Sequence, residues 1–397
     1  MANIETPDQV LVRYGEIGLK SPGVRRHLEV LLHNHLAIML NRHHVPYTEI
    51  SRERGRFFIH TTAPEEASKA CSRVFGVVSA SPTWRVSVQL ETITSAIADL
   101  GPHLLQKDQS FAVRARRLKT HPFTSQDIAA QAGSAVMQRM TAAGHPVTVN
   151  LDAPDVEIHV EVRQRFAYIF TDILPGPGGF PYGSQGTVIG LHSGGLDSPV
   201  AQWLLMKRGA RVIPLYFDTD APNTQRLHVR AIDSINALAE WIPAKNFELL
   251  IIPFYEVLTK LQHSRHPKLT CILCKRMMYR LGAMVAAREE AKALVTGEML
   301  GQVASQTLAN LNVLSSAVAI PILRPLVGLD KSDTMTLARR IGTYAASSRD
   351  VGDCFAVPDQ PSVAALLDEV HAAESELGLS ELAQKAFDGL KRVPVVG

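Results

Sequence analysis

The sequence predicts an α/β protein in which a doubly wound parallel sheet forms the C-terminal part and two smaller α+β domains precede it. A chain of 397 residues is longer than one hydrophobic core normally covers, and hydrophobic residues make up 46% of it. Short apolar runs alternate with stretches of helical periodicity along the whole chain. A segment rich in glycine and proline, residues 173–186, separates the two parts.

The first 70 residues are predicted to form a strand, a helix and a second strand. An apolar run covers residues 10–15, hydrophobic residues recur at helical spacing over 24–39, and an extended run follows at 56–62. We therefore assign residues 1–70 to a small α+β domain.

Residues 71–175 are predicted to form a second α+β domain. Its helices and strands are expected at residues 64–74, 84–90, 92–105, 110–118 and 125–141, with extended chain after them. Alternation within 110–118 places Arg114 and Arg116 on one face of the strand. That face could contact a nucleic-acid backbone or could simply be solvated. The other cations nearby in the sequence are Arg52, Arg54, Arg56, Arg117 and Lys119.

Residues 176–397 are predicted to form the third domain. Its strands are expected at residues 187–191, 211–217, 247–254, 293–298 and 321–326, with helical stretches between them. This alternation is typical of a doubly wound parallel sheet. Such sheets bind ligands at the carboxyl ends of their strands.

A glycine turn follows the first strand of this third domain. Its residues are Ser193, Gly194, Gly195, Asp197 and Ser198, and Pro199 then favours a helix. Glycines allow a phosphate to approach the main chain, the hydroxyls add donors, and the helix presents the positive end of its dipole. The turn lacks the lysine of a Walker loop. It resembles the PP-loop of ATP pyrophosphatases, although a loop rich in turn residues is the simpler interpretation of Ser-Gly-Gly alone.

Two further segments lie where a nucleotide would bind. Tyr216 and Phe217 end the second strand of the third domain and could offer adenine an apolar wall, although aromatic residues at such positions usually belong to the core. The segment from Gly297 to Leu311 combines a glycine turn with polar side chains, including that of Gln306. Ligand contact and a solvated, capped helix are both compatible with that composition.

The four cysteines are too few and too unevenly placed for a disulfide framework. Cys271 and Cys274 form a C-x-x-C motif that could bind a metal or a cluster, act as a redox pair, or be two buried thiols. Cys354 lies in a polar, turn-rich segment and would complete a set of three thiolates. We expect Cys71 to be a buried thiol without a chemical role.

The composition argues against some classes of protein. No apolar run is long enough to cross a membrane, and the N-terminus lacks the pattern of a signal peptide, so we expect no membrane partner and a cytoplasmic location. The net charge of +3 is compatible with RNA binding but too small to indicate it.

Several motifs together resemble one family. They are YGEIGLKSPG, GGFPYGSQG, SGGLDS, CKRMMYR, LVTGEMLGQVASQTLANL, PILRPLVGLDK and IGTYAASSRDVGDC. In this order the motifs look like those of tRNA 4-thiouridine synthetase (ThiI), and the resemblance covers nearly the whole chain. It implies a ferredoxin-like domain, a THUMP domain and a PP-loop ATP pyrophosphatase domain, the first two of which hold tRNA.

The resemblance also assigns roles to residues. It implies that Cys354 is the catalytic cysteine and that Asp197 holds Mg²⁺ or positions the phosphates of ATP, while Lys275 offsets their charge. The phosphates would lie in the glycine turn. The other contacts to ATP would come from Leu191, His192, Tyr216, Phe217, Lys275, Gly297 and Gln306.

Two departures from the family pattern favour an iron–sulfur enzyme. Many bacterial members carry a rhodanese domain, for which the residues after Cys354 leave no room, and a resolving cysteine where this chain has Leu215. Cys271 and Cys274 instead stand where cluster-containing relatives place cluster ligands. With Cys354 they are expected to bind a cluster, [4Fe–4S] in preference to [3Fe–4S], that takes sulfide or receives sulfur from a donor protein.

The expected activity is therefore ATP-dependent transfer of sulfur to a tRNA uridine, at position 8 in this family, to give 4-thiouridine. A homodimer is expected, and a second role in thiamine biosynthesis stays open. One alternative keeps the reaction but makes Cys354 a persulfide carrier that Cys271 or Cys274 resolves without a cluster. Another is a tRNA-binding protein without catalytic activity.

Overall fold

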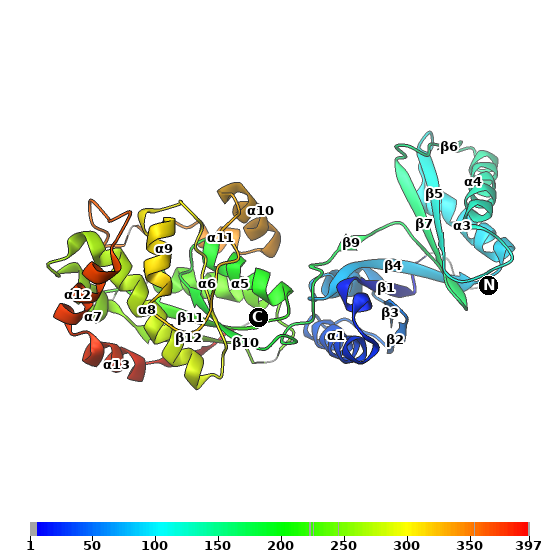
Figure 1. Ribbon diagram of the computed structural model, residues 1–397. Coiled ribbons are helices and arrows are strands. Elements are labelled where there is room, and N and C mark those ends of the chain that lie inside the picture. The colour runs from blue at the N-terminus through cyan, green and yellow to red at the C-terminus, as the bar shows by residue number, and fades with distance from the viewer. Residues whose placement is uncertain (1–5, 222–223, 225, 245, 353, 396–397) are drawn as a thin grey trace. The chain divides into compact units, whose positions relative to one another are not determined.

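The computed structural model describes residues 6–221, 224, 226–244, 246–352 and 354–395. Residues 1–5, on which the expectation about a signal peptide partly rests, lie outside this set. The chain divides into two compact units, one ending at Gly179 and the other beginning at Phe180, so the division falls within the predicted linker (Figure 1). No helix of the described ranges is long and apolar enough to span a membrane.

The first unit contains four α-helices and nine strands among its described residues. Its helices are α1 (Pro22–Arg42), α2 (Pro64–Cys71), α3 (Leu90–Leu104) and α4 (Ser125–Ala142), and a 3-10 turn covers Glu16–Leu19. Its strands are β1 (Gln9–Tyr14), β2 (Glu49–Glu53), β3 (Arg56–His60), β4 (Val77–Ser87), β5 (Ser110–Arg117), β6 (Thr148–Val149), β7 (Val156–Val162), β8 (Phe166–Phe170) and β9 (Leu174–Pro175).

One sheet runs through this unit because strand β4 belongs to both of its halves. The strand order is β2-β3-β1-β4-β8-β7-β5-β6, and β9 pairs with β4. Strand β4 pairs with β1 over its first part and with β8 over its last part, and Figure 1 shows it as a long ribbon that joins the two halves. The expected boundary at residue 70 falls inside α2, which packs against α1, β1 and β4.

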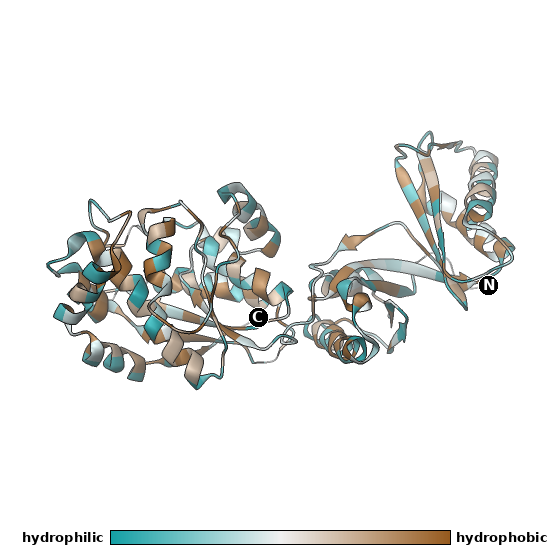
Figure 2. Ribbon diagram, in the orientation of Figure 1, coloured by the Kyte–Doolittle hydropathy of each residue, from teal (hydrophilic) through white to brown (hydrophobic). Residues whose placement is uncertain are grey.

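Helices α3 and α4 cover the half of this sheet that contains β5, β6, β7 and β8. Their apolar faces pack on alternate residues of β5 and β7, among them Phe111, Val113, Ile158 and Val160. Figure 2 shows the corresponding alternation of hydrophobic and hydrophilic residues along these strands. The alternation predicted from the sequence is therefore what turns one face of the sheet toward the helices.

The second unit contains nine α-helices and six strands among its described residues. The helices are α5 (Asp197–Lys207), α6 (Arg226–Ala239), α7 (Tyr255–Gln262), α8 (Thr270–Arg288), α9 (Leu308–Ser315), α10 (Lys331–Ile341), α11 (Tyr344–Ser347), α12 (Leu367–Leu377) and α13 (Ser380–Asp388). The strands are β10 (Thr187–His192), β11 (Arg211–Asp218), β12 (Glu248–Pro253), β13 (Leu294–Val295), β14 (Ile322–Leu323) and β15 (Lys391–Pro394). The 3-10 turns cover Pro267–Leu269 and Ala304–Gln306.

The sheet of the second unit has the order β14-β13-β10-β11-β12-β15. Its first five strands are parallel, as predicted, whereas β15 adds an antiparallel edge that the sequence analysis missed. Strand β13 is shorter than the predicted 293–298, because the chain leaves the sheet after Val295 and packs on the start of α5 at Gly297. Strands β10 and β11 end side by side, with His192 opposite Tyr216.

Candidate active site

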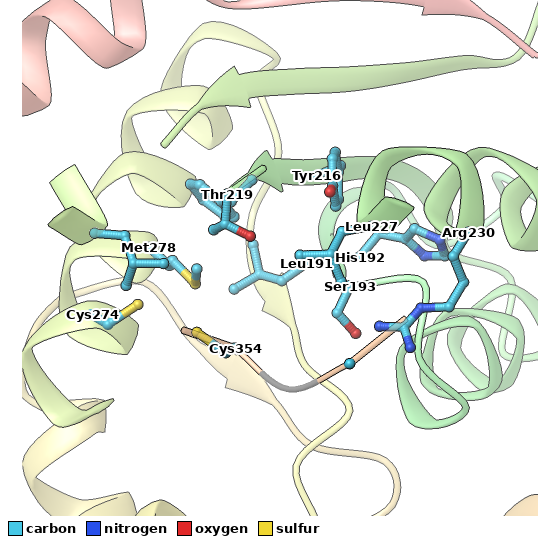
Figure 3. A pocket seen from close by; sticks show the side chains of 13 residues that line it. Leu191, His192, Ser193, Tyr216, Thr219, Leu227, Arg230, Cys274, Met278 and Cys354 are labelled. Carbon is cyan, nitrogen blue, oxygen red and sulfur yellow. The ribbon is translucent and has the colours of Figure 1, made fainter. Parts of the chain in front are cut away.

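A cavity of about 450 Å³ lies at the carboxyl ends of β10 and β11, which is where a parallel sheet is expected to bind ligands. Figure 3 shows thiol groups at one end of it and Ser193 at the other. The described lining residues are Leu191, His192, Ser193, Tyr216, Phe217, Thr219, Leu227, Arg230, Leu258, Cys274, Met278, Gly352 and Cys354. The fold thus brings residues of four predicted motifs to one place.

The glycine turn lies at the junction between β10 and α5. The Ser193 N–H donates to Ser198 Oγ at 3.1 Å, and the Gly195 N–H donates to Ser193 Oγ at 3.3 Å. Gly194 has a φ of +73°, and a Cβ at this position would lie 2.7 Å from Ala231 Cα. Only glycine satisfies both conditions. The turn therefore packs directly against α6, and its Ser193 amide is bonded to the first turn of α5.

Asp197, the first residue of α5, is held from outside the turn. Lys331 Nζ lies 2.7 Å from Asp197 Oδ1. Lys331 begins α10 and follows the capping residue Asp330. Lys331 ends the PILRPLVGLDK motif, but no local pattern predicts its contact with a residue 134 positions away.

Gly297 and Gln306 shape the loop beside the turn and are not among the described lining residues. A Cβ on Gly297 would lie 2.8 Å from the carbonyl carbon of Asp197, so glycine is required for the loop to pack on the start of α5. The Gln306 Oε1 atom accepts a hydrogen bond from the Met299 N–H at 3.3 Å. The structure therefore gives both residues a supporting role around the cavity.

His192 is buried and neutral, and its hydrogen bonds join the end of β10 to helices α5 and α6. Its Nε2 lies 2.8 Å from Ser234 Oγ and 3.2 Å from the Ala231 carbonyl, and its Nδ1 lies 3.3 Å from Gln202 Nε2. This pattern places the proton on Nε2, because Nδ1 must accept from the Gln202 amide. Burial lowers the pKa of His192 to about 4, although the bond to the Ala231 carbonyl opposes the shift.

The burial of neutral His192 predicts a pH-dependent loss of stability. Below the ordinary pKa of 6.5 the unfolded chain takes up a proton that the folded chain refuses until about pH 4. The stabilisation is therefore complete above pH 6.5 and declines by up to about 3 kcal/mol as the pH falls toward 4. In urea unfolding at pH 7, 6 and 5, the stability difference between wild type and His192→Gln should shrink with falling pH. A difference that is independent of pH would contradict this assignment.

Lys275 is held by a buried carboxylate, Glu298. Lys275 Nζ lies 3.1 Å from Glu298 Oε1. Tyr279 OH and Arg324 Nε donate to Glu298 Oε2 at 2.6 and 2.7 Å. Burial acts to raise the pKa of Glu298, but the Lys275 charge and these hydrogen bonds outweigh it, and the net pKa is lowered. Glu298 therefore stays ionised and fixes helix α8 to the ends of β13 and β14.

Tyr216 and Phe217 point to opposite faces of β11. Phe217 packs edge-on against Phe254 with ring centroids 5.3 Å apart, as a core residue does. Tyr216 is 3% exposed, and its hydroxyl has no hydrogen-bond partner among the described residues. Burial raises the pKa of this phenol, so the hydroxyl keeps its proton.

The cavity contains a charged residue that the sequence analysis did not identify. Arg230 of α6 is the one arginine or lysine, and the one formally charged side chain, among the described lining residues. A single arginine in an amphipathic helix is normally read as a surface residue, and no local signal marks this one.

Two of the three predicted thiols line the cavity, and the third lies on the helix that carries one of them. Cys274 and Cys354 are lining residues, and Cys271 precedes Cys274 by one turn of α8. Burial raises the pKa of both Cys271 and Cys274, and the Cys354 thiol raises it further. No three His, Cys, Asp or Glu side chains of the described ranges are already placed as ligands of a single metal ion.

Helix α8 is anchored on the side away from the cavity. Arg276 is 1% exposed and pairs with Glu374 of α12 at 2.7 Å. It also donates to Ser316 Oγ at 2.8 Å.

Cys71, as expected, is buried in α2 of the first unit, and burial raises its pKa to about 12.

The predicted arginine face of the first unit is largely paired with acids. Arg114 lies 2.9 Å from Glu157, and Arg56 lies 3.0 Å from Glu161. Arg116 is exposed on the same face of β5. The pairing of Arg114 with Glu157 of β7 joins residues 43 positions apart, so the pattern within β5 could not predict it.

A doubly wound parallel sheet with this glycine turn defines a PP-loop domain of the α/β class, here following two α+β domains. Residues 183–379 match the family described as thiamine biosynthesis protein (ThiI), residues 9–81 its ferredoxin-like domain, and residues 89–172 the THUMP domain. A probable tRNA sulfurtransferase of Methanosarcina acetivorans is 43% identical over 97% of this chain and 93% of its own length. The chain therefore belongs to the ThiI family.

Two further relatives support this membership. A probable tRNA sulfurtransferase of Methanosarcina mazei is 43% identical over 96% of this chain and 94% of its own length. A crystal structure of a 4-thiouridine synthetase–RNA complex with bound ATP superposes with a TM-score of 0.82 at 27% identity, covering 98% of this chain and 100% of the other.

Proposed function

We propose that this protein is an ATP-dependent tRNA sulfurtransferase that converts a tRNA uridine, expected at position 8, to 4-thiouridine. The observation that carries the proposal is a single cavity that joins a phosphate-binding turn to the thiols of Cys274 and Cys354. The names of the relatives and the RNA and ATP held by the similar structure support the same activity. The ferredoxin-like and THUMP domains would bind the tRNA, and a homodimer is part of the proposal.

ATP would bind with its nucleoside near Tyr216 and its phosphates at the glycine turn. The Asp197 carboxylate and the serine hydroxyls are oxygen donors of the kind that Mg²⁺ prefers, so this donor set fits the ion. When bound, Mg²⁺ would neutralise charge on the phosphates. Lys331 and Lys275 are already oriented by Asp197 and Glu298, which limits the reorganisation needed during the reaction.

The reaction needs two substitutions. Uridine O4 attacks the α-phosphorus of ATP, the bond to the bridging oxygen breaks, and pyrophosphate leaves with its negative charge held by the turn. The uridine oxygen then belongs to AMP, which is a good leaving group. A sulfur nucleophile attacks C4, and AMP departs with the original O4 atom.

We propose that Cys271, Cys274 and Cys354 hold an iron–sulfur cluster, [4Fe–4S] in preference to [3Fe–4S], beside this substrate. Two of these thiols line one end of the cavity and Cys271 lies one turn away on α8, and three thiols so placed form a donor set that suits such a cluster. Each cysteine of a cubane binds a different iron, so its ligands need not be arranged around one ion. When bound, the cluster would supply an iron without a cysteine ligand, which can bind sulfide.

The persulfide mechanism is the alternative, and iron content separates the two. Protein purified without oxygen should contain about three to four irons per chain and be brown. Cys271→Ala should lose the iron and 4-thiouridine formation from sulfide while keeping ATP binding. Colourless, iron-free protein that still makes 4-thiouridine would instead support a persulfide on Cys354 that is resolved by Cys271 or Cys274.

Pyrophosphate release distinguishes the enzyme from a tRNA-binding protein without activity. We expect release from ATP to require tRNA, because uridine O4 is the attacking atom. If neither tRNA nor sulfide produces any release, the enzymatic proposal fails. A role in thiamine biosynthesis would be tested separately, by complementation of a thiamine-requiring strain.

A further inference from the structure

Two polar groups beside the cavity have no hydrogen-bond partner among the described residues. The Tyr216 hydroxyl and the Arg230 Nε atom are buried, and neither makes a hydrogen bond to any described residue. Burial also lowers the pKa of Arg230, although not enough to remove its charge. Leaving a buried donor unsatisfied costs free energy, so such a pair is expected to face a ligand that accepts hydrogen bonds.

The fold places Arg230 directly beside the glycine turn. A Cβ on Gly194 would lie 3.1 Å from the carbonyl carbon of Arg230 and 2.7 Å from Ala231 Cα, so α6 and the turn are in backbone contact. In Figure 3 the Arg230 side chain and Ser193 lie at the same end of the cavity, away from Cys274 and Cys354. The missing side chain at residue 194 is thus what allows α6 to bring a cation to the turn.

The other cations of the site are already paired. Lys275 is bound to Glu298 and Lys331 to Asp197. No carboxylate of the described residues forms an ion pair with Arg230, so its charge is available to an anion from outside the chain. Its environment is also partly desolvated, which strengthens a charge-assisted hydrogen bond.

We propose that Arg230 and the Tyr216 hydroxyl form a subsite for the α-phosphate of the nucleotide, beside the glycine turn. The proposal rests on the proposed function. The β11 end would hold the nucleoside, and the turn with Asp197 would hold the pyrophosphate. A side chain that lies between the nucleoside and the pyrophosphate would contact the α-phosphate, because this phosphate joins the two. Arg230 would then contact this phosphate in ATP, during attack by uridine O4, and in the departing AMP.

The test measures the binding of adenosine, AMP and ATP to the full-length protein by calorimetry. Arg230→Gln should weaken both AMP and ATP about 10- to 100-fold, because each loses a charge-assisted contact, and should leave adenosine unchanged. Arg230→Lys keeps a charge without the Nε donor and should recover part of the loss. Arg226→Gln, at the exposed start of α6, is the matched control and should bind all three ligands as wild type does.

A second variant separates ligand contact from folding. Tyr216→Phe removes a hydroxyl that has no partner in the described part of the chain, so it should leave the stability unchanged or raise it, yet weaken the binding of AMP and ATP a few-fold. The proposal is overturned if adenosine binding weakens as much as AMP binding, or if AMP binding is unchanged in both Arg230 variants. Weakening of ATP alone also overturns it, because Arg230 would then contact the outer phosphates. If wild type itself fails to bind ATP, the proposed function fails instead.

Discussion

Cys354→Ser is expected to abolish 4-thiouridine formation while tRNA-dependent pyrophosphate release continues. Cys354 is exposed and lies at the end of the cavity away from Ser193, so its thiol should serve sulfur transfer without touching the glycine turn. A serine hydroxyl neither carries sulfane sulfur nor binds iron as a thiolate does. Loss of such a group lowers the rate by about 10³-fold or more. The two products should be measured in one reaction mixture, thionucleoside by absorbance and pyrophosphate by an enzyme-coupled assay.

Cys71→Ala is the matched control for this prediction. It removes a thiol that is buried in the first unit, outside the cavity, and should leave both products at wild-type levels. If the Cys354→Ser variant still makes 4-thiouridine, Cys354 is not the catalytic cysteine. Loss of pyrophosphate release together with thiolation would show that this residue acts on adenylation instead.

Gly194→Ala is expected to eliminate ATP binding and to destabilise the second unit. The φ of +73° is unfavourable for alanine, and the added Cβ would lie 2.7 Å from Ala231 Cα. Because the obstacle is helix backbone, α6 and the turn must separate. The two effects together should cost about 2–4 kcal/mol in urea unfolding. ATP binding should become undetectable by calorimetry, since both the turn and Arg230 would move.

Gly195→Ala provides the comparison within the same turn. Its φ is not in the left-handed region, and a Cβ there would contact only Ser193 Oγ at 3.4 Å among the described residues. We expect its stability to stay within about 0.5 kcal/mol of wild type. If the two alanine variants are equally stable, close packing of the turn on α6 is not what requires glycine at residue 194.

The two ends of the cavity are mechanically linked through Glu298. This carboxylate binds Lys275 on the helix that carries Cys271 and Cys274, and it also binds Arg324 just after β14. Gly297, the residue just before Glu298, packs on the backbone of Asp197 at the start of α5. Helix α8 and the glycine turn are therefore supported by neighbouring parts of one buried network, which fixes the position of Cys271 and Cys274 relative to the turn.

Most of the architecture and part of the site could be predicted from sequence. The parallel strands and the glycine turn depend on local patterns of apolar residues, glycine and proline, and the structure has them where these patterns lie. The pairing of Lys331 with Asp197 joins residues 134 positions apart, and the Glu298 network joins three separate elements. Neither leaves a periodic signal, because an ion pair depends on where two side chains meet in space.

The strand and helix pattern, the glycine turn and the three cysteines of the proposed cluster site could be recognised in the sequence alone. These features follow from the conformational preferences of short segments and from the reactivity of single side chains. Tertiary packing, by contrast, buries His192 in its neutral form, pairs Arg114 with Glu157, and brings Arg230 to the cavity. Burial and the approach of distant charges set those outcomes, and both arise only when the chain has packed.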